Sequence, residues 1–276
     1  MLKSKHKFIA VVVISWALAA VHVEGILNHS FAQSLLPQEL TLNEIYEAGS
    51  GLPVGKIQSI WGDVVILHAD MIDGYLAKVG LPLFNGDTIV TTENGSFGCK
   101  LNDGSTIRLA SNSKLTINHS THDARRKSSF SVLSLIPGNA YFKIAKLDEF
   151  EAREFKVETD VVVAGGRQAD FIIMVAEGIT EILALQATIL QVASLEDPEQ
   201  KIVLSDFQRA VILDGVLPAT VEMIPTEEAA QLVSQFYQIP EGILSDMAMR
   251  KLREKEIFED EDILEEDIEK DDFFIE

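Results

Sequence analysis

Thiols are nearly missing from this sequence, which has one cysteine, Cys99, in 276 residues. A single thiol excludes an intrachain disulfide framework and any metal site that needs several cysteines. Cys99 lies on the apolar side of an alternating segment. We therefore predict a buried, inert thiol rather than a catalytic nucleophile.

Basic side chains are also scarce. Lysine and arginine number 23 against 43 aspartates and glutamates, which gives a formal net charge of −20 and an isoelectric point near 4.6. Such a surface repels phosphate backbones, so nucleic acid is excluded as a partner. Cations and basic protein surfaces are the compatible partners.

Long apolar runs are missing except near the N-terminus, where Phe8–Val21 follows three lysines. A membrane-spanning helix needs about 20 apolar residues, and this run is shorter. It predicts a signal peptide over residues 1–32, with cleavage after Ala32 favoured over Ala19. The protein is then exported to a periplasm of the Gram-negative type. The alternative is an uncleaved anchor on the inner membrane, with the chain facing the periplasm.

The clearest pattern present is an alternation between positions 97 and 117. Asn94-Gly95 and Asp103-Gly104 provide turn signals before and within it. Alternation places one face of a strand inward, and Asp-Gly favours a tight hairpin. The large apolar residues and the thiol are all odd-numbered: Phe97, Cys99, Leu101, Ile107, Leu109, Leu115 and Ile117. This predicts a mainly β fold of short antiparallel strands, as a sandwich, a roll or a β-solenoid-like domain.

Changes in pattern divide the chain into five parts. After the signal peptide, residues 33–52 form a linker with one short helix, because Thr41 and Glu44 have capping-box spacing. The all-β domain covers residues 53–225, with Met71–Lys78 as an ambiguous, loop-like stretch. Residues 226–253 form a helical segment, and residues 254–276 form an acidic tail.

A pair of histidines invites a test for a metal site. His119 and His122, with Asp123, could ligate zinc if a helix placed both imidazoles on one face. Asn118–Ser129 instead has the composition of a polar loop, and Arg125 nearby opposes a cation. We therefore predict no metal site, and no cofactor.

The helical segment has an apolar stripe. Thr226 is the expected N-cap, and a second helix is expected from Glu241 to about Lys255. We expect the stripes to pack on the sheet rather than to form a partner groove. The stripe of the first helix consists of Ala229, Leu232, Val233 and Phe236.

The acidic tail, residues 254–276, has 13 acidic and two basic side chains. Dense like charge disfavours compaction, so the composition predicts a disordered tail. Its apolar pairs, such as Ile257-Phe258 and Phe273-Phe274, leave open a second role: docking on a partner and folding there.

From about Val54 to Ile224, the order of short motifs resembles the FecR-type domain, an exported all-β module. Gln168 and Ala169 depart from the R-G-T-x-F pattern of the family. The matching residues are Gly62, Gly86-Asp87, Thr91, Asp103-Gly104-Ser105, Ser113-Lys114-Leu115, the Gly138 that follows Leu135, Phe155–Thr159, and Arg167 with Phe171.

The resemblance implies structural roles rather than chemistry for Gly86, Asp87, Asp103, Gly104, Ser105, Arg167 and Phe171. The best-known members of the family relay an envelope signal to a sigma factor through a cytoplasmic region. Only seven residues precede the apolar run here, so we expect that region to be absent. For Arg167 we expect burial and an ion pair with Asp87 or Asp103 that holds turns together.

Three functions follow from these patterns. The favoured one is a non-enzymatic periplasmic binding or scaffolding protein that contacts envelope proteins, with the acidic tail as one route. The alternative is an accessory sensor in envelope signalling, working with a transmembrane regulator. An enzyme is not expected, because no base and orienting group are placed near Cys99 or a serine.

Overall fold

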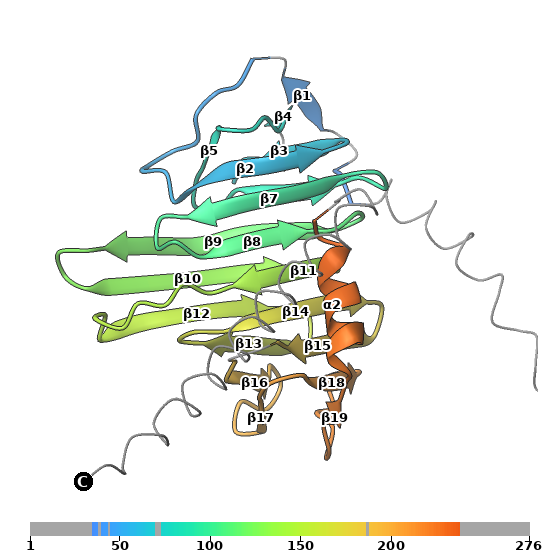
Figure 1. Ribbon diagram of the computed structural model, residues 1–276. Helices are drawn as coiled ribbons and strands as arrows, with labels where there is room; N and C mark the ends of the chain where they lie inside the picture. Colours follow the sequence, from blue (N-terminus) through green and yellow to red (C-terminus); the bar gives the residue numbers. More distant parts are fainter. Residues whose placement is uncertain (1–34, 38–39, 44, 70–72, 186–187, 238–276) are drawn as a thin grey trace, which may run out of the picture.

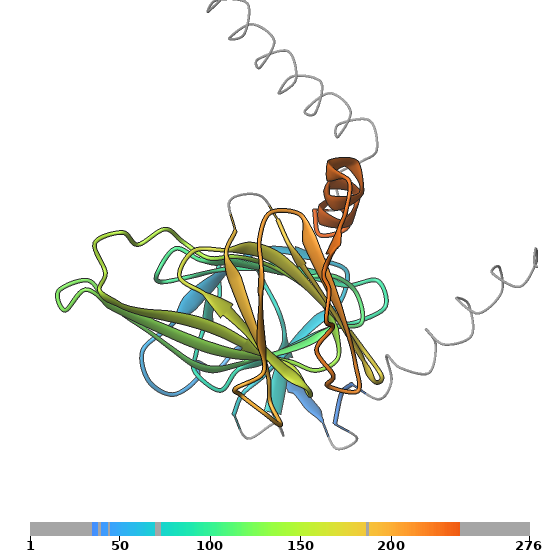
Figure 2. The same cartoon turned by 90° about the horizontal axis from the view of Figure 1, so that it is seen from below.

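A computed structural model of the protein describes residues 35–37, 40–43, 45–69, 73–185 and 188–237. Two large β-sheets face each other and enclose the core, and one helix lies outside the two layers (Figures 1 and 2). The described strands do not close into a barrel. The predicted mainly β fold is confirmed.

Both sheets are listed here in their spatial order. Sheet A contains β1 (Thr41–Asn43), β4 (Asp73–Leu76), β3 (Val64–Leu67), β6 (Thr88–Thr91), β9 (Lys114–Asp123), β10 (Ser128–Leu135), β12 (Ala152–Glu158), β13 (Val162–Gly166), β16 (Leu190–Ser194) and β17 (Lys201–Leu204). Sheet B contains β19 (Glu222–Met223), β18 (Gln208–Leu213), β15 (Ile179–Ala184), β14 (Asp170–Ala176), β11 (Gly138–Lys143), β8 (Thr106–Leu109), β7 (Ser96–Leu101), β2 (Gly55–Trp61) and β5 (Pro82–Leu83).

From β7 onward, the chain adds strands alternately to the two sheets. The hairpin β7–β8 joins sheet B, β9–β10 joins sheet A, β11 joins sheet B, and β12–β13 joins sheet A. The hairpins β14–β15, β16–β17 and β18–β19 continue the alternation. Both sheets therefore grow in the same direction, from β1 to β17 in sheet A and from β5 to β19 in sheet B (Figure 1). The fold is a two-layer roll with solenoid-like progression.

The pairing is not wholly antiparallel. β10 and β12 are parallel neighbours, with Ser131 opposite Phe155, and β1 is parallel to β4. The chain leaves sheet A after β10, forms β11 in sheet B, and returns, so β12 runs in the same direction as β10.

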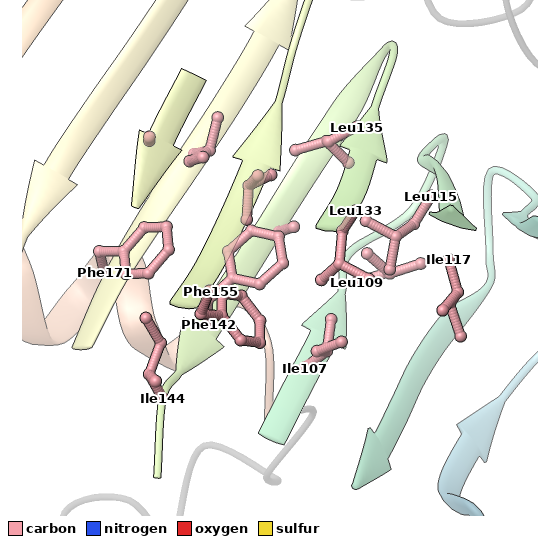
Figure 3. Packing of buried hydrophobic residues seen from close by; sticks show 14 of the residues in the cluster. Ile107, Leu109, Leu115, Ile117, Leu133, Leu135, Phe142, Ile144, Phe155 and Phe171 are labelled. Carbon is pink, nitrogen blue, oxygen red and sulfur yellow. The ribbon is translucent and has the colours of Figure 1, made fainter. Parts of the chain in front are cut away.

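The core forms from the alternation that the sequence shows. All seven odd-numbered residues from Phe97 to Ile117 named above are buried between the sheets. Phe142 and Phe171 stack with their ring centroids 5.1 Å apart, and Phe155 packs edge-on against Phe142 (Figure 3). Burial of apolar surface on this scale is the main force that holds the two layers together.

Two local expectations are wrong, and one ambiguous stretch is settled. Thr41–Asn43 is a strand rather than the start of a helix, and the stretch Met71–Lys78, which the sequence left ambiguous, contains the strand Asp73–Leu76. β1 pairs with β4, and β4 also pairs with β3. The pairing of β1 with β4 is a tertiary contact that a local pattern does not encode. Asn118–Ser129 is not a loop, because most of it belongs to the long hairpin β9–β10, where Ser120 and Ser131 bond through their hydroxyls at 2.9 Å.

The helix α2 (Thr226–Ser234) confirms the first half of the predicted helical pair, while the second half lies outside the described residues. Its N-cap is Pro225 rather than Thr226, with no side-chain capping bond. Ala229 and Phe236 are buried against sheet B together with Tyr141, Ile172 and Leu183. The expected packing of the stripe on the sheet is therefore present for this helix.

In the described part of the chain, no helix is long and apolar enough to cross a membrane. The predicted signal peptide and the acidic tail lie outside the described residues.

Candidate functional site

Asp87 is a buried carboxylate at the start of β6. Its Oδ2 accepts the backbone N–H of Phe84 at 2.8 Å, and its Oδ1 lies 2.9 Å from Nδ1 of His68. Nε2 of His68 lies 3.0 Å from the carbonyl oxygen of Glu47. Burial raises the pKa of the Asp87 carboxyl, although the hydrogen bonds from His68 and Phe84 oppose this. The pair therefore ties the segment before β2 to strands β3 and β6.

The residue before Asp87 needs a special backbone. Gly86 has φ of +88°, and a Cβ there would lie 2.8 Å from Cβ of Ala69. Glycine tolerates this conformation and leaves the space that Ala69 requires.

The turn Asp103-Gly104-Ser105 closes the hairpin β7–β8, with Gly104 at φ +93°. Oδ1 of Asp103 accepts the N–H of Ser105 at 2.8 Å, and Oδ2 accepts its hydroxyl at 3.0 Å. The Ser105 Oγ in turn accepts the N–H of Ala145 at 3.0 Å. These bonds connect the hairpin to the segment that follows β11.

A third polar cluster joins the crossovers between the layers. The hydroxyl of Thr91 donates to the carbonyl of Ala110 at 2.6 Å and accepts the N–H of Ser113 at 2.9 Å. The Ser113 Oγ accepts the N–H of Asn139 at 2.9 Å. Thr91 and Ser113 are fully buried. Loss of these hydrogen bonds would leave buried polar groups without partners and would lower the free energy of unfolding.

Arg167 does not hold turns together. It is exposed, and Asp87 and Asp103, its expected partners, are bonded to His68 and Ser105 instead. The prediction of a buried ion pair is therefore wrong. The physical reason is that Arg167 lies just beyond the end of β13, on the outside of sheet A.

Arg167 borders hollows on the outer side of sheet A. One of about 330 Å³ lies over β12, β13 and β16, and another of about 560 Å³ extends to β17. Gly165, Gly166, Arg167 and Gln191 line both. We call this continuous depression the outer groove.

The outer groove is hollow because of one glycine. Lys156, Gly165, Gln191 and Val203 lie opposite one another on four neighbouring strands. A Cβ at Gly165 would lie 2.5 Å from the carbonyl oxygen of Phe155, so a side chain is excluded there and the groove stays open.

Other groups considered for chemistry lie apart from the outer groove. Cys99 is buried, as predicted, and burial raises the pKa of its thiol to about 12. His119 is exposed, whereas His122 stacks on Phe150 at 5.2 Å. Among the residues that the structure describes, no group of three metal-ligating side chains occurs.

Comparison with protein families identifies the module. Residues 87–189 match the family model described as "FecR protein". Over this range the chain is similar to the FecR family. The resemblance inferred from the motifs is confirmed over this range, which contains Asp87, Asp103-Gly104-Ser105 and Phe171, whereas Gly86 lies just before it.

Two solved crystal structures resemble this chain, both described as a "putative anti-sigma factor from Parabacteroides distasonis ATCC 8503". Their identities are 14% and 13%, and each has a TM-score of 0.42. Each match covers 52% of this chain and 62% of the other. No curated protein sequence matches the chain.

Within the matched range, the motif residues Asp87, Asp103, Ser105 and Phe171 all make structural contacts in turns or in the core. Sequence reasoning missed two residues: His68, which pairs with Asp87, and Arg153, which lines the outer groove. His68 follows a buried strand, but no spacing connects it to Asp87. Arg153 lies in β12, where it is paired with Ser129 of β10, and its position beside the outer groove depends on this strand pairing.

Proposed function

We propose that this protein is an exported, non-enzymatic binding or scaffolding protein that acts through contacts with envelope proteins. The observation that carries the proposal is how the motif residues are used. The polar groups of Asp87, Thr91, Asp103, Ser105 and Ser113 are engaged in turns and crossovers, which suits a rigid scaffold rather than a reaction centre.

The surface offers groups that bind proteins. Trp61, at the end of β2, is 64% exposed, and Val79 is exposed to the same extent. Tryptophan is enriched among residues that dominate binding energy at interfaces. We propose that Trp61 takes part in such a contact.

A photo-cross-linking amino acid at position 61, introduced in the producing cell, tests this function. We expect one discrete adduct with an envelope protein from position 61. The same replacement at the exposed Thr121, on the hairpin β9–β10, should give none. Identical adduct ladders from both positions, or recovery of the protein in the cytosol on fractionation, would contradict the proposal.

The FecR domain match favours a second function, an accessory sensor that passes an envelope stimulus to a membrane regulator. Deletion of the gene separates the two functions. A sensor predicts that transcription changes only when the stimulus is applied, whereas a scaffold predicts loss of the bound protein with or without the stimulus.

A further inference from the structure

The outer groove has a cationic side that the fold does not use. Nε and Nη1 of Arg153 are buried, and neither has a hydrogen-bond partner in the described part of the chain. Arg153 and Arg167 line the hollows at the ends of β12 and β13. A guanidinium without a partner favours a carboxylate at its accessible edge.

The acidic residues beside the outer groove are already engaged. Oε1 of Glu154 lies 2.8 Å from Nζ of Lys156. Both carboxyl oxygens of Asp103 accept hydrogen bonds from Ser105. The two arginines therefore leave a local positive charge on a chain whose net charge is −20.

The other side of the outer groove is apolar. Ile189 is 72% exposed and Val203 is 57% exposed, and both line the larger hollow. An occupant that matches the whole groove therefore combines carboxylates with apolar side chains at short intervals.

We propose that the outer groove binds the acidic tail of this same chain, residues 254–276. The tail has 13 acidic and two basic residues, interrupted by apolar pairs such as Phe273-Phe274. Its carboxylates pair with Arg153 and Arg167, while an apolar pair covers Ile189 and Val203. This contact is independent of the envelope partner proposed above.

The connection is long enough for the tail to reach the groove of its own chain. Residues 238–253 join the last described residue, Tyr237, to the tail, and 16 extended residues span at most about 55 Å. α2 lies on the outside of sheet B, and the groove lies on the outside of sheet A. Packed sheets are about 10 Å apart, so a path around the edge of the roll is well within reach.

Cross-linking between engineered thiols tests the contact in the full chain, because the native Cys99 is buried. One new cysteine is Phe274→Cys in the tail, and the other is Gln168→Cys beside the groove. A short bismaleimide should join them within one chain. The matched control pairs Phe274→Cys with Val211→Cys, which is 41% exposed on sheet B and should react much less.

Charge reversal then tests the recognition. Arg167→Glu should lower the intrachain yield by about fivefold, as expected for loss of a partly exposed ion pair and gain of repulsion. Arg125→Glu makes the same charge change on the exposed β9–β10 turn and should leave the yield unchanged. High salt should weaken the contact.

Three results would overturn the proposal: equal yields from the Gln168→Cys and Val211→Cys pairs, an Arg167→Glu yield equal to that of the parent protein, or cross-linked dimers in place of intrachain products. Dimers would assign the groove to the tail of a second copy. None of these results bears on the adduct at position 61, so the two proposals fail separately.

Discussion

At the scale of single residues, the protein places its polar groups where the backbone needs them. Asp87 shows this best, because its two oxygens serve a backbone N–H and an imidazole at once. A buried carboxylate is tolerated only when it is bonded in this way. The same logic applies to Thr91 and Ser113, whose hydroxyls satisfy buried backbone groups of the crossovers.

The His68–Asp87 pair should stabilise the fold measurably. His68→Ala removes a bond to a buried carboxylate, and we expect the free energy of unfolding to fall by about 1–3 kcal/mol. His119→Ala, at an exposed position, should change it by less than about 0.5 kcal/mol. Urea denaturation measures both variants, and equal effects would show that the pair adds nothing.

Cys99 should resist thiol reagents in the folded protein. Because burial raises its pKa from 9.0 to about 12, the thiol remains protonated and shielded at pH 8, and labelling should require unfolding. The unfolded chain ionises first, so this contribution to stability is complete below pH 9 and is lost as the pH rises towards 12. Ellman's reagent, with and without guanidinium, checks the labelling. Rapid reaction of the native protein would contradict the buried environment.

At the scale of elements, the crossovers between the sheets are tighter than the hairpins within them. Gly138 begins β11 with φ of +129°, and a Cβ there would lie 2.4 Å from Cα of Ser113. Two backbones therefore meet where the chain passes from sheet A to sheet B. Only glycine fits such an approach.

Gly138→Ala should destabilise the protein far more than a positive φ alone would. Gly80→Ala is the matched control, because Gly80 has φ of +91° and its nearest atom to an added Cβ is Cε of Lys56 at 3.7 Å. We expect Gly138→Ala to lower the free energy of unfolding by at least about 2 kcal/mol more than Gly80→Ala, because overpacking is added to the backbone strain. Thermal melts compare the two, and similar shifts would rule out the crowding.

At the scale of the whole molecule, the roll and its outer helix are distinct layers. α2 is held by Ala229 and Phe236 against sheet B, and by Arg209, whose guanidinium lies 3.0 Å from Glu228 and 2.8 Å from Glu222. The main core between the sheets contains none of these residues. We therefore expect that the helix can detach without unfolding the roll.

Ala229→Asp should release α2. Ala229 is 2% exposed, and a carboxylate cannot be buried there without a partner. Amide hydrogen exchange should quicken over residues 226–234 and stay slow in β11 and β14. Gln231→Asp, on the exposed side of the same helix, should leave both unchanged. Faster exchange throughout both sheets would mean that the helix belongs to one cooperative unit with the roll.

The sequence alone predicted the inner faces of the strands. The alternation from Phe97 to Ile117 and the Asp103-Gly104 turn depend only on neighbouring residues, and both are found in the structure. It did not predict the strand Thr41–Asn43, because that strand is formed by pairing with the distant Asp73–Leu76, and it left Asp73–Leu76 itself ambiguous. The long hairpin β9–β10 was missed because its polar side chains bond across the strands rather than pack in a core.

The sequence by itself determined the class of fold, the buried thiol and the resemblance to the FecR family, since these depend on periodicity, turn residues and the order of motifs. Only the tertiary structure decided which charges meet. In the structure, Asp87 is paired with His68, and Arg167 is exposed. Arg167 and Arg153 line the same groove on sheet A, which also contains Gly165. Electrostatic pairing depends on distances of a few ångströms between segments far apart in the chain, and local patterns do not contain those distances.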